Sequence, residues 1–226
     1  MFRILTDELV KLPKFILIIM LSFLAVHICM LILNFGFGHR RVYGLALLFN
    51  LDAENNVPAW FSAIILFIAS VLLYMIHKVS LSVKRDYFWL FLSLIFLYMS
   101  FDEMAGFHER FIDSLRNSFN LSGFLYFSWV IVGIPFVLVV GLLSIPFLRR
   151  LPPLAAMYFI CAGFLYVMGA AGMEMVGASV FETHKNRMLY SCITTIEETL
   201  EMLGVIFFIY AQIRYLTFLL DKRDTY

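Results

Sequence analysis

The chain has 226 residues, of which 62% are hydrophobic and 15% are charged, and its mean hydropathy is +0.90. Soluble globular proteins carry about 25% charged residues, so this composition excludes an ordinary soluble enzyme and predicts a membrane protein. The net charge of +1 gives no basic surface for phosphate, and we therefore expect no nucleic-acid partner.

Six apolar stretches are long enough to cross a bilayer, because about 20 such residues span the hydrocarbon core. We predict them at residues 13–35, 59–77, 87–109, 122–148, 153–178 and 188–219. The first stretch follows basic residues, as in a signal peptide, but it is too long for a signal-peptide core and is predicted to be retained. The expected fold is all-α: a polytopic transmembrane bundle forming a single domain over residues 1–226.

Lys and Arg residues indicate the orientation of the bundle. With six spans, both termini share one side of the membrane with the second and fourth connections. That side carries ten Lys or Arg residues and the other side carries six. The cytoplasmic side of a membrane protein is the one enriched in Lys and Arg, so both termini are predicted to be cytoplasmic.

Carboxylates inside the predicted spans are the strongest functional signal. An ionised group at the centre of a bilayer costs roughly 2.5–3.5 kcal/mol on insertion scales, so such groups must face the bundle interior, share protons or bind a cation. The acids in question are Asp102, Glu103, Glu109, Glu174, Glu197, Glu198 and Glu201.

The predicted topology places these acids in one layer, in the outer half of the membrane. Glu197, Glu198 and Glu201 share a helical face. Asp102 and Glu109 are seven residues apart and are predicted to share a stripe of one helix. The connection before the second span adds a possible acidic loop, with Asp52, Glu54 and Asn56. Its alternative interpretation is an ordinary capping loop before Pro58.

Crowded like charges raise one another's pKa, and a divalent cation would relieve their repulsion. Oxygen ligands suit Ca, Mg or Mn, and iron when a histidine joins them. We predict a divalent metal ion of unknown identity, with a general base among the acids that do not bind it. The candidate ligands are Asp102, His108, Glu109, Glu174, Glu197 and Glu201, and the candidate bases are Glu103 and Glu198. The alternative is that the acids are protonated packing groups.

Three motifs resemble a group of bacterial multipass membrane proteins without assigned function. They are the LDxExN run at 51–56, the SxDE-x4-HE pattern at 100–109 and the EExxE pattern at 197–201. The resemblance implies a location in the bacterial inner membrane. A more distant similarity links the acidic loop to alkaline ceramidases, which are membrane-embedded hydrolases. The HxxxH pair of their last helix is absent here, and Glu197 and Glu201 hold the corresponding spacing.

Two classes of function fit this pattern. In the first, the protein is a metal-dependent hydrolase that acts on a membrane lipid or another amphiphile arriving in the outer leaflet. In the second, it is a cation- or proton-coupled carrier. A non-catalytic metal-binding membrane protein is a further alternative. The inner halves of the third, fifth and sixth spans are nearly apolar, which favours an outward-facing site over a path through the membrane.

Overall fold

The computed structural model describes residues 2–39, 42–80, 86–183 and 186–224, and side chains from residue 8 to residue 222 within these ranges. Six helical stretches in it are long and apolar enough to cross a membrane, which confirms the predicted all-α class. They are Glu8–Phe37, Val57–Ser80, Phe88–Ala105, Val130–Leu148, Pro153–Thr183 and Arg187–Lys222.

The first three of these spans lie in α1 (Phe2–Phe37), α3 (Val57–Ser80) and α4 (Phe88–Ala105), and the fourth is α6 (Val130–Leu148). The fifth consists of α7 (Pro153–Val167), the π-helix η3 (Met168–Met173) and α8 (Glu174–Thr183), and the sixth lies in α9 (Arg187–Asp224). Short elements connect them: η1 (Val42–Gly44), α2 (Leu45–Leu48), α5 (Phe107–Phe119) and η2 (Gly123–Leu125).

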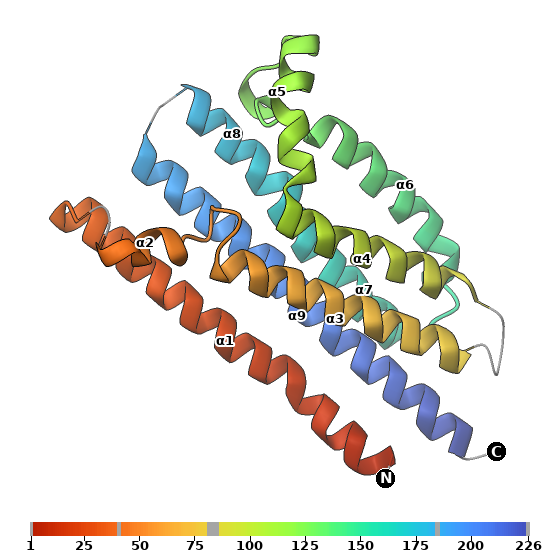
Figure 1. Cartoon of the computed structure of the whole chain (residues 1–226). Helices are drawn as coiled ribbons and strands as arrows, with labels where there is room; N and C mark the ends of the chain where they lie inside the picture. Colours follow the sequence, from red (N-terminus) through yellow and green to blue (C-terminus); the bar gives the residue numbers. More distant parts are fainter. Residues whose placement is uncertain (1, 40–41, 81–85, 184–185, 225–226) are drawn as a thin grey trace.

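The centre of the bundle is formed by α3 and α9. In their most apolar stretches, 61% of α3 and 50% of α9 is buried, against 17% or less for the other spans. Helix α3 packs on α4 and α9, while α9 also packs on α1 and α7. Figure 1 shows α6 at the edge of the bundle and the two ends of the chain at the same end of it. The apolar outer faces of these helices suit contact with lipid.

Polar contacts join the middle of α3 to its neighbours α4 and α9. The Ser70 hydroxyl of α3 donates a hydrogen bond to the Ser93 carbonyl of α4 at 2.8 Å, and the Ser93 hydroxyl donates to the Ser70 carbonyl at 2.9 Å. From α9, Gln212 Nε2 donates to the Ala69 carbonyl at 3.1 Å. In a bilayer the lipid is as apolar as the helix surfaces, so the hydrophobic effect does not drive helices together. Hydrogen bonds between helices, such as these, stabilise their association instead.

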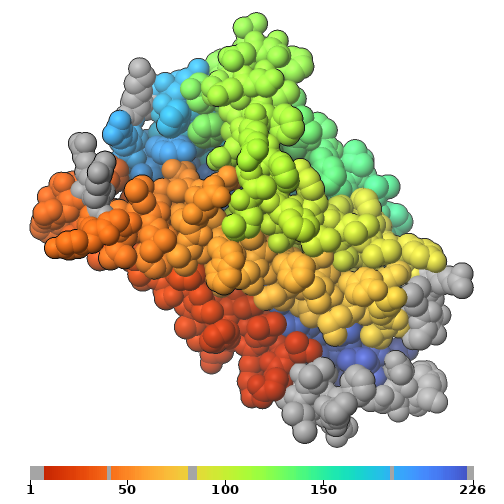
Figure 2. All heavy atoms as spheres, in the orientation of Figure 1, coloured from red at the N-terminus to blue at the C-terminus, as the bar shows by residue number. Residues whose placement is uncertain are grey.

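The prediction for the third span was wrong at its C-terminal end. Helix α4 stops at Ala105, because Gly106 adopts φ 58° and its N–H donates to the Asp102 carbonyl at 2.8 Å. A left-handed glycine is a common helix terminator. The chain then turns into α5, so His108 and Glu109 lie outside the span, and the stripe predicted for Asp102 and Glu109 does not exist. Figures 1 and 2 show α5 standing out from the bundle.

Other boundaries also differ from the prediction. The fourth span begins at Val130, after the turn η2, and not at residue 122. Helix α1 begins at Phe2 and contains Pro13, so it starts well before the predicted first span. Several basic residues that bear on the orientation lie outside the described residues: Arg40, Arg41, Lys84, Arg85 and Lys185. The cytoplasmic location of the termini stays a prediction.

Candidate acidic site

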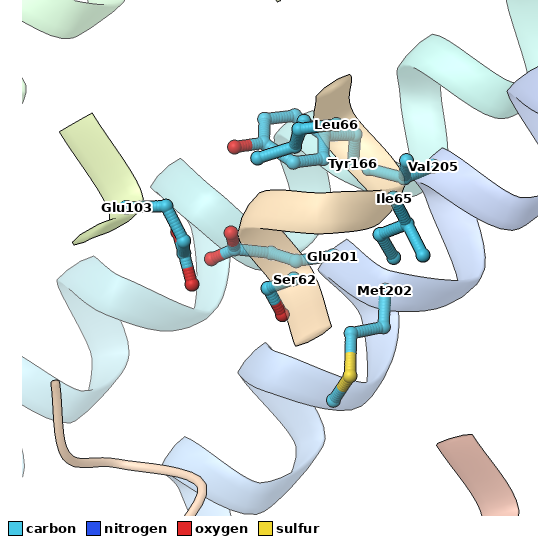
Figure 3. Close-up of a pocket in the computed structure, with 8 residues that line it drawn as sticks. All are labelled: Ser62, Ile65, Leu66, Glu103, Tyr166, Glu201, Met202 and Val205. Atoms are coloured by element: carbon cyan, nitrogen blue, oxygen red, sulfur yellow. The ribbon is translucent and has the colours of Figure 1, made fainter. Parts of the chain in front are cut away.

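Acids from two spans meet in a small cavity at the centre of the bundle. Glu103 of α4 and Glu201 of α9 line it together with Ser62 of α3 and Tyr166 of α7, as Figure 3 shows. The centre of a water molecule can move within about 10 Å³ of this cavity. The cavity therefore has room for about one water molecule. Apolar side chains close the remaining walls: Ile65, Leu66, Met202 and Val205.

Further carboxylates surround this cavity without lining it. The charge of Glu198 interacts with those of Glu201, Glu103 and Glu174, and also with that of Asp52 in the acidic loop. The structure therefore gathers acids from α4, α8, α9 and the loop before α3 in one region. This arrangement is what the predicted topology required.

A π-helix positions the fifth span against α9. At Gly169, a Cβ atom would lie 2.8 Å from the Glu197 carbonyl oxygen and 2.8 Å from Glu201 Cγ, so only glycine allows this approach. The π-turn η3 ends at Met173, and Glu174 then opens α8. Single π-turns inside α-helices occur frequently at functional sites. Here the irregular turn brings the backbone of the fifth span against two acids of α9.

Glu174, which directly follows η3, forms a pair with Glu197 of α9. The indole Nε1–H of Trp129 donates to Glu174 Oε1 at 2.7 Å. Glu197 is only 7% exposed, its carboxyl borders that of Glu174, and its Oε2 has no hydrogen-bond partner in the part of the chain that the structure describes. A buried unpaired carboxyl oxygen costs free energy, so it is a natural place for a proton or a cation.

Asp102 and His108 form a closely bonded pair at the turn between α4 and α5. Asp102 Oδ1 accepts from the His108 backbone N–H at 3.1 Å, and Oδ2 lies 2.8 Å from Nδ1 of the His108 ring. Burial lowers the pKa of His108, but the hydrogen bond and charge of Asp102, with the charges of Glu54 and Glu174, outweigh it and raise the pKa to about 9. At neutral pH the ring is therefore an imidazolium.

Trp129 connects this pair to the Glu174–Glu197 pair. Its ring meets the His108 ring edge-on, with centroids 5.2 Å apart, while its N–H bonds Glu174. Nδ1 of His108 faces Asp102, and in the described part of the chain no hydrogen bond occupies Nε2. Nε2 is consequently the ring atom that is able to exchange a proton with another group.

The acidic loop belongs to the same region through Glu54. Its carboxylate lies against Gly106: a Cβ there would stand 2.1 Å from Glu54 Oε2. Burial, with the charges of Glu109 and Asp102, raises the pKa of Glu54 to about 7, although His108 and Arg110 oppose this. Asn56 instead fits the capping alternative, because its Oδ1 accepts from the Ala59 N–H at 3.1 Å.

Asp52, the third member of the loop, faces α9. The Tyr190 hydroxyl donates a hydrogen bond to Asp52 Oδ1 at 3.1 Å. Burial of the carboxyl raises the pKa of Asp52 to about 6; the Tyr190 bond opposes this, while Glu174 and Glu109 add to it. The loop is also tied to α1, because the Leu51 N–H donates to Nδ1 of the buried His27 at 3.2 Å. Nε2 of His27 then donates to the Thr195 hydroxyl at 3.0 Å.

The aromatic members of the site were not predicted. Trp129 contacts both His108 and Glu174. Tyr166 lies beside Glu201, and Tyr190 bonds Asp52. Aromatic residues make up 17% of the chain, and no sequence pattern distinguishes these three from the aromatic residues that face lipid.

The predicted metal ligands occupy neighbouring places and not one shell. Asp102 and His108 are paired at the α4–α5 turn, Glu174 and Glu197 pack together, Glu201 faces the cavity, and Glu109 is exposed on α5. Among the described residues, no three His, Cys, Asp or Glu side chains stand together so that they could hold a metal ion. Direct ligation by this set would require the side chains to move together.

The fold and the site define a multipass membrane protein with a layer of acids between its helices. The chain belongs to the family described as Domain of unknown function (DUF8692), whose family model matches residues 8–215. That match includes all three acidic motifs. Comparisons with curated proteins and with solved structures gave no match.

Proposed function

We propose that the protein is a divalent-cation-dependent hydrolase that acts on a lipid or another amphiphile within the membrane. The observation that carries this proposal is the Asp102–His108 pair beside the cavity of Glu103 and Glu201. A carboxylate-oriented imidazole next to a cavity with room for about one water has the elements of acid–base hydrolysis.

Electrostatics supports a cation in this layer. The positive groups that act on Glu54 are His108 and Arg110, whereas several carboxylates surround the cavity. Oxygen donors of Glu174, Glu197 and Glu201, once their side chains move together, would suit a hard cation such as Ca²⁺ or Mg²⁺. When bound, such a cation would offset the repulsion between the acids and polarise a carbonyl or phosphoryl oxygen.

The side chains around the cavity would take separate roles in this reaction. Glu103 or Glu198 would accept a proton from water as it attacks the ester or amide carbonyl. His108, charged at neutral pH, would donate its Nε2 proton to the departing alcohol or amine. Asp102 holds the ring through Nδ1 and stabilises its charge, as a carboxylate does for histidine in hydrolases. Two groups thus exchange one proton each, and the products are a carboxylic acid and an alcohol or amine.

Cation binding is tested by elemental analysis and by melting the purified protein with and without chelator. Binding to the folded state raises stability, so chelator should lower the Tm of the wild type. Glu201→Gln removes one charge of the cluster and should respond far less. Glu8→Gln is the matched control, because Glu8 is an exposed acid paired with Lys11. Equal melting in all conditions, in protein without bound metal, would contradict cation binding.

Hydrolysis is tested separately on lipid vesicles that contain the protein. The wild type should release fatty acid, and His108→Gln should slow release by roughly 10²–10⁴-fold while it keeps the bound metal. A metal-loaded protein whose His108→Gln variant is as active as the wild type would contradict the assigned role of His108. A metal-loaded wild type with no hydrolytic activity would leave a non-catalytic metal-binding protein.

The second candidate is a proton- or cation-coupled carrier. It is favoured by Glu197 Oε2, which is buried and has no hydrogen-bond partner among the described residues. It is also favoured by the buried polar side chains of Ser70, Ser93 and Gln212, which lie further along α3, α4 and α9. Protein in liposomes should then dissipate an imposed pH gradient, and Glu197→Gln should abolish this flux. A tight wild-type liposome would exclude this candidate.

A further inference from the structure

A second cavity lies where α8 ends and α9 begins, outside the acidic cluster. Its volume is about 370 Å³, within the usual range of small-molecule sites. This position is at the ends of two membrane-spanning stretches, Pro153–Thr183 and Arg187–Lys222, where lipid headgroups lie. Its lining residues are Tyr126, Phe181, Glu182, Asn186, Arg187 and Tyr190.

Aromatic rings form one wall of this cavity. Phe181 lies 5.2 Å from Tyr190 and 5.8 Å from Tyr126, measured between ring centroids. Phe127 supports them from 5.7 Å to Phe181. The guanidinium of Arg116 covers one face of Tyr126 at 4.2 Å. The rings are therefore held by one another, and one face of Tyr126 is occupied by the Arg116 guanidinium.

Charged groups complete the cavity. Glu182 Oε2 accepts a hydrogen bond from the Gly123 N–H, which fixes the carboxylate and leaves Oε1 for another partner. Arg187 also lines the cavity and forms no ion pair within the described part of the chain. One cavity thus contains a carboxylate among aromatic rings together with an available guanidinium.

We propose that this cavity binds the headgroup of a zwitterionic phospholipid. The aromatic faces and Glu182 would receive the ammonium group, because the electron-rich faces of aromatic rings attract quaternary and primary ammonium ions. Arg187 would bind the phosphate, for which its planar guanidinium provides paired donors. This site goes beyond the proposed hydrolysis, and its occupancy does not depend on it. Tyr190 connects the two regions, since its hydroxyl bonds Asp52.

The test measures binding of dihexanoyl-phosphatidylcholine, below its micellar concentration, to the whole protein in detergent by saturation-transfer NMR. Dihexanoyl-phosphatidylglycerol, which lacks the ammonium group, is the comparison ligand. The wild type should prefer the choline lipid. The double variant Phe181→Leu/Glu182→Gln should weaken choline-lipid binding about 5- to 30-fold and remove the preference. Arg187→Gln should weaken both lipids alike.

Phe124→Leu is the matched control. Phe124 is an exposed aromatic residue of η2, close to the lining residue Tyr126 in the chain, but it does not line the cavity itself. It should bind as the wild type does. Equal binding of the two lipids by the wild type, or unchanged binding by the double variant, would overturn the proposal. Binding of free glycerophosphocholine as tightly as the short-chain lipid would also overturn it, by assigning the cavity to a soluble zwitterion.

Discussion

The pairing of Asp102 with His108 predicts a specific pH dependence of stability. The pKa of His108 is raised from 6.5 to about 9. Folding therefore favours the protonated ring, so the stabilisation is fully present below pH 6.5, declines between pH 6.5 and 9, and is absent above that. A difference of about 2.5 in pKa corresponds to roughly 3.4 kcal/mol. Because the His108 side chain is 32% exposed, solvent screens the interaction and we expect about 1–2 kcal/mol.

Asp102→Asn removes the charge that holds this proton. At pH 6.5 the variant should melt about 2–8 °C below the wild type, and the difference should shrink towards pH 9.5. The assay is thermal unfolding in detergent at pH 6.5, 7.5 and 9.5. Glu54, whose pKa is raised to about 7, has completed most of its titration by pH 7.5, so the change between pH 7.5 and 9.5 reports on His108.

His108→Gln provides the control for this experiment. In that background, Asp102→Asn should change the Tm by an amount that does not vary with pH, because the titrating partner has gone. A difference between wild type and Asp102→Asn that stays constant from pH 6.5 to 9.5 would refute the reasoning. It would mean that Asp102 stabilises the protein only by capping α5 through the His108 backbone N–H.

Three further predictions follow from the packing and the topology. Gly106→Ala should lower the Tm by about 2–8 °C, because φ 58° costs an L-residue about 1–2 kcal/mol and the new Cβ displaces Glu54, whereas Gly106→Asn should cost less. If thermal unfolding gave both variants the same Tm as the wild type, the predicted strain at Gly106 would be contradicted. Gly204→Ala should destabilise the protein by about 1–3 kcal/mol, because its Cβ would lie 2.7 Å from the Tyr166 backbone nitrogen. Gly163→Ala, which has open space around it, should leave the stability unchanged. Equal melting temperatures for the two variants would argue against the close contact between α7 and α9. In protein whose native cysteines are replaced, a membrane-impermeant thiol reagent should label Asn117→Cys from outside intact cells and should not label Lys222→Cys; the reverse pattern would invert the orientation.

The sequence was sufficient for the class, the number of spans and the meeting of acids from the third and sixth spans. Long apolar stretches are unambiguous at this composition, and an ionisable residue inside one has few acceptable surroundings. Glu103 and Glu201 accordingly share a cavity although they are far apart in the chain.

The details that the sequence did not provide depend on backbone conformation. Gly106 falls inside the third span predicted at residues 87–109, but it adopts a left-handed conformation that ends α4 and allows the Asp102–His108 pair to form. The π-turn at 168–173 likewise has no periodic signal, because a run of small residues also suits ordinary close packing. Gly106 contacts Glu54, and Gly169 of the π-turn contacts α9. These contacts exist only in the folded bundle.

The two irregular turns have a common effect on the acids. At Gly106 the chain changes direction, so Asp102 caps the helix that follows and bonds the His108 ring. At η3 the fifth span approaches α9 closely enough for Gly169 to contact Glu197 and Glu201, and Glu174 follows directly. Regular helices would have carried His108 along the axis of α4 and moved Glu174 around α8. The acidic layer therefore depends on these interruptions, and straightening either one should disperse the site before it unfolds the bundle.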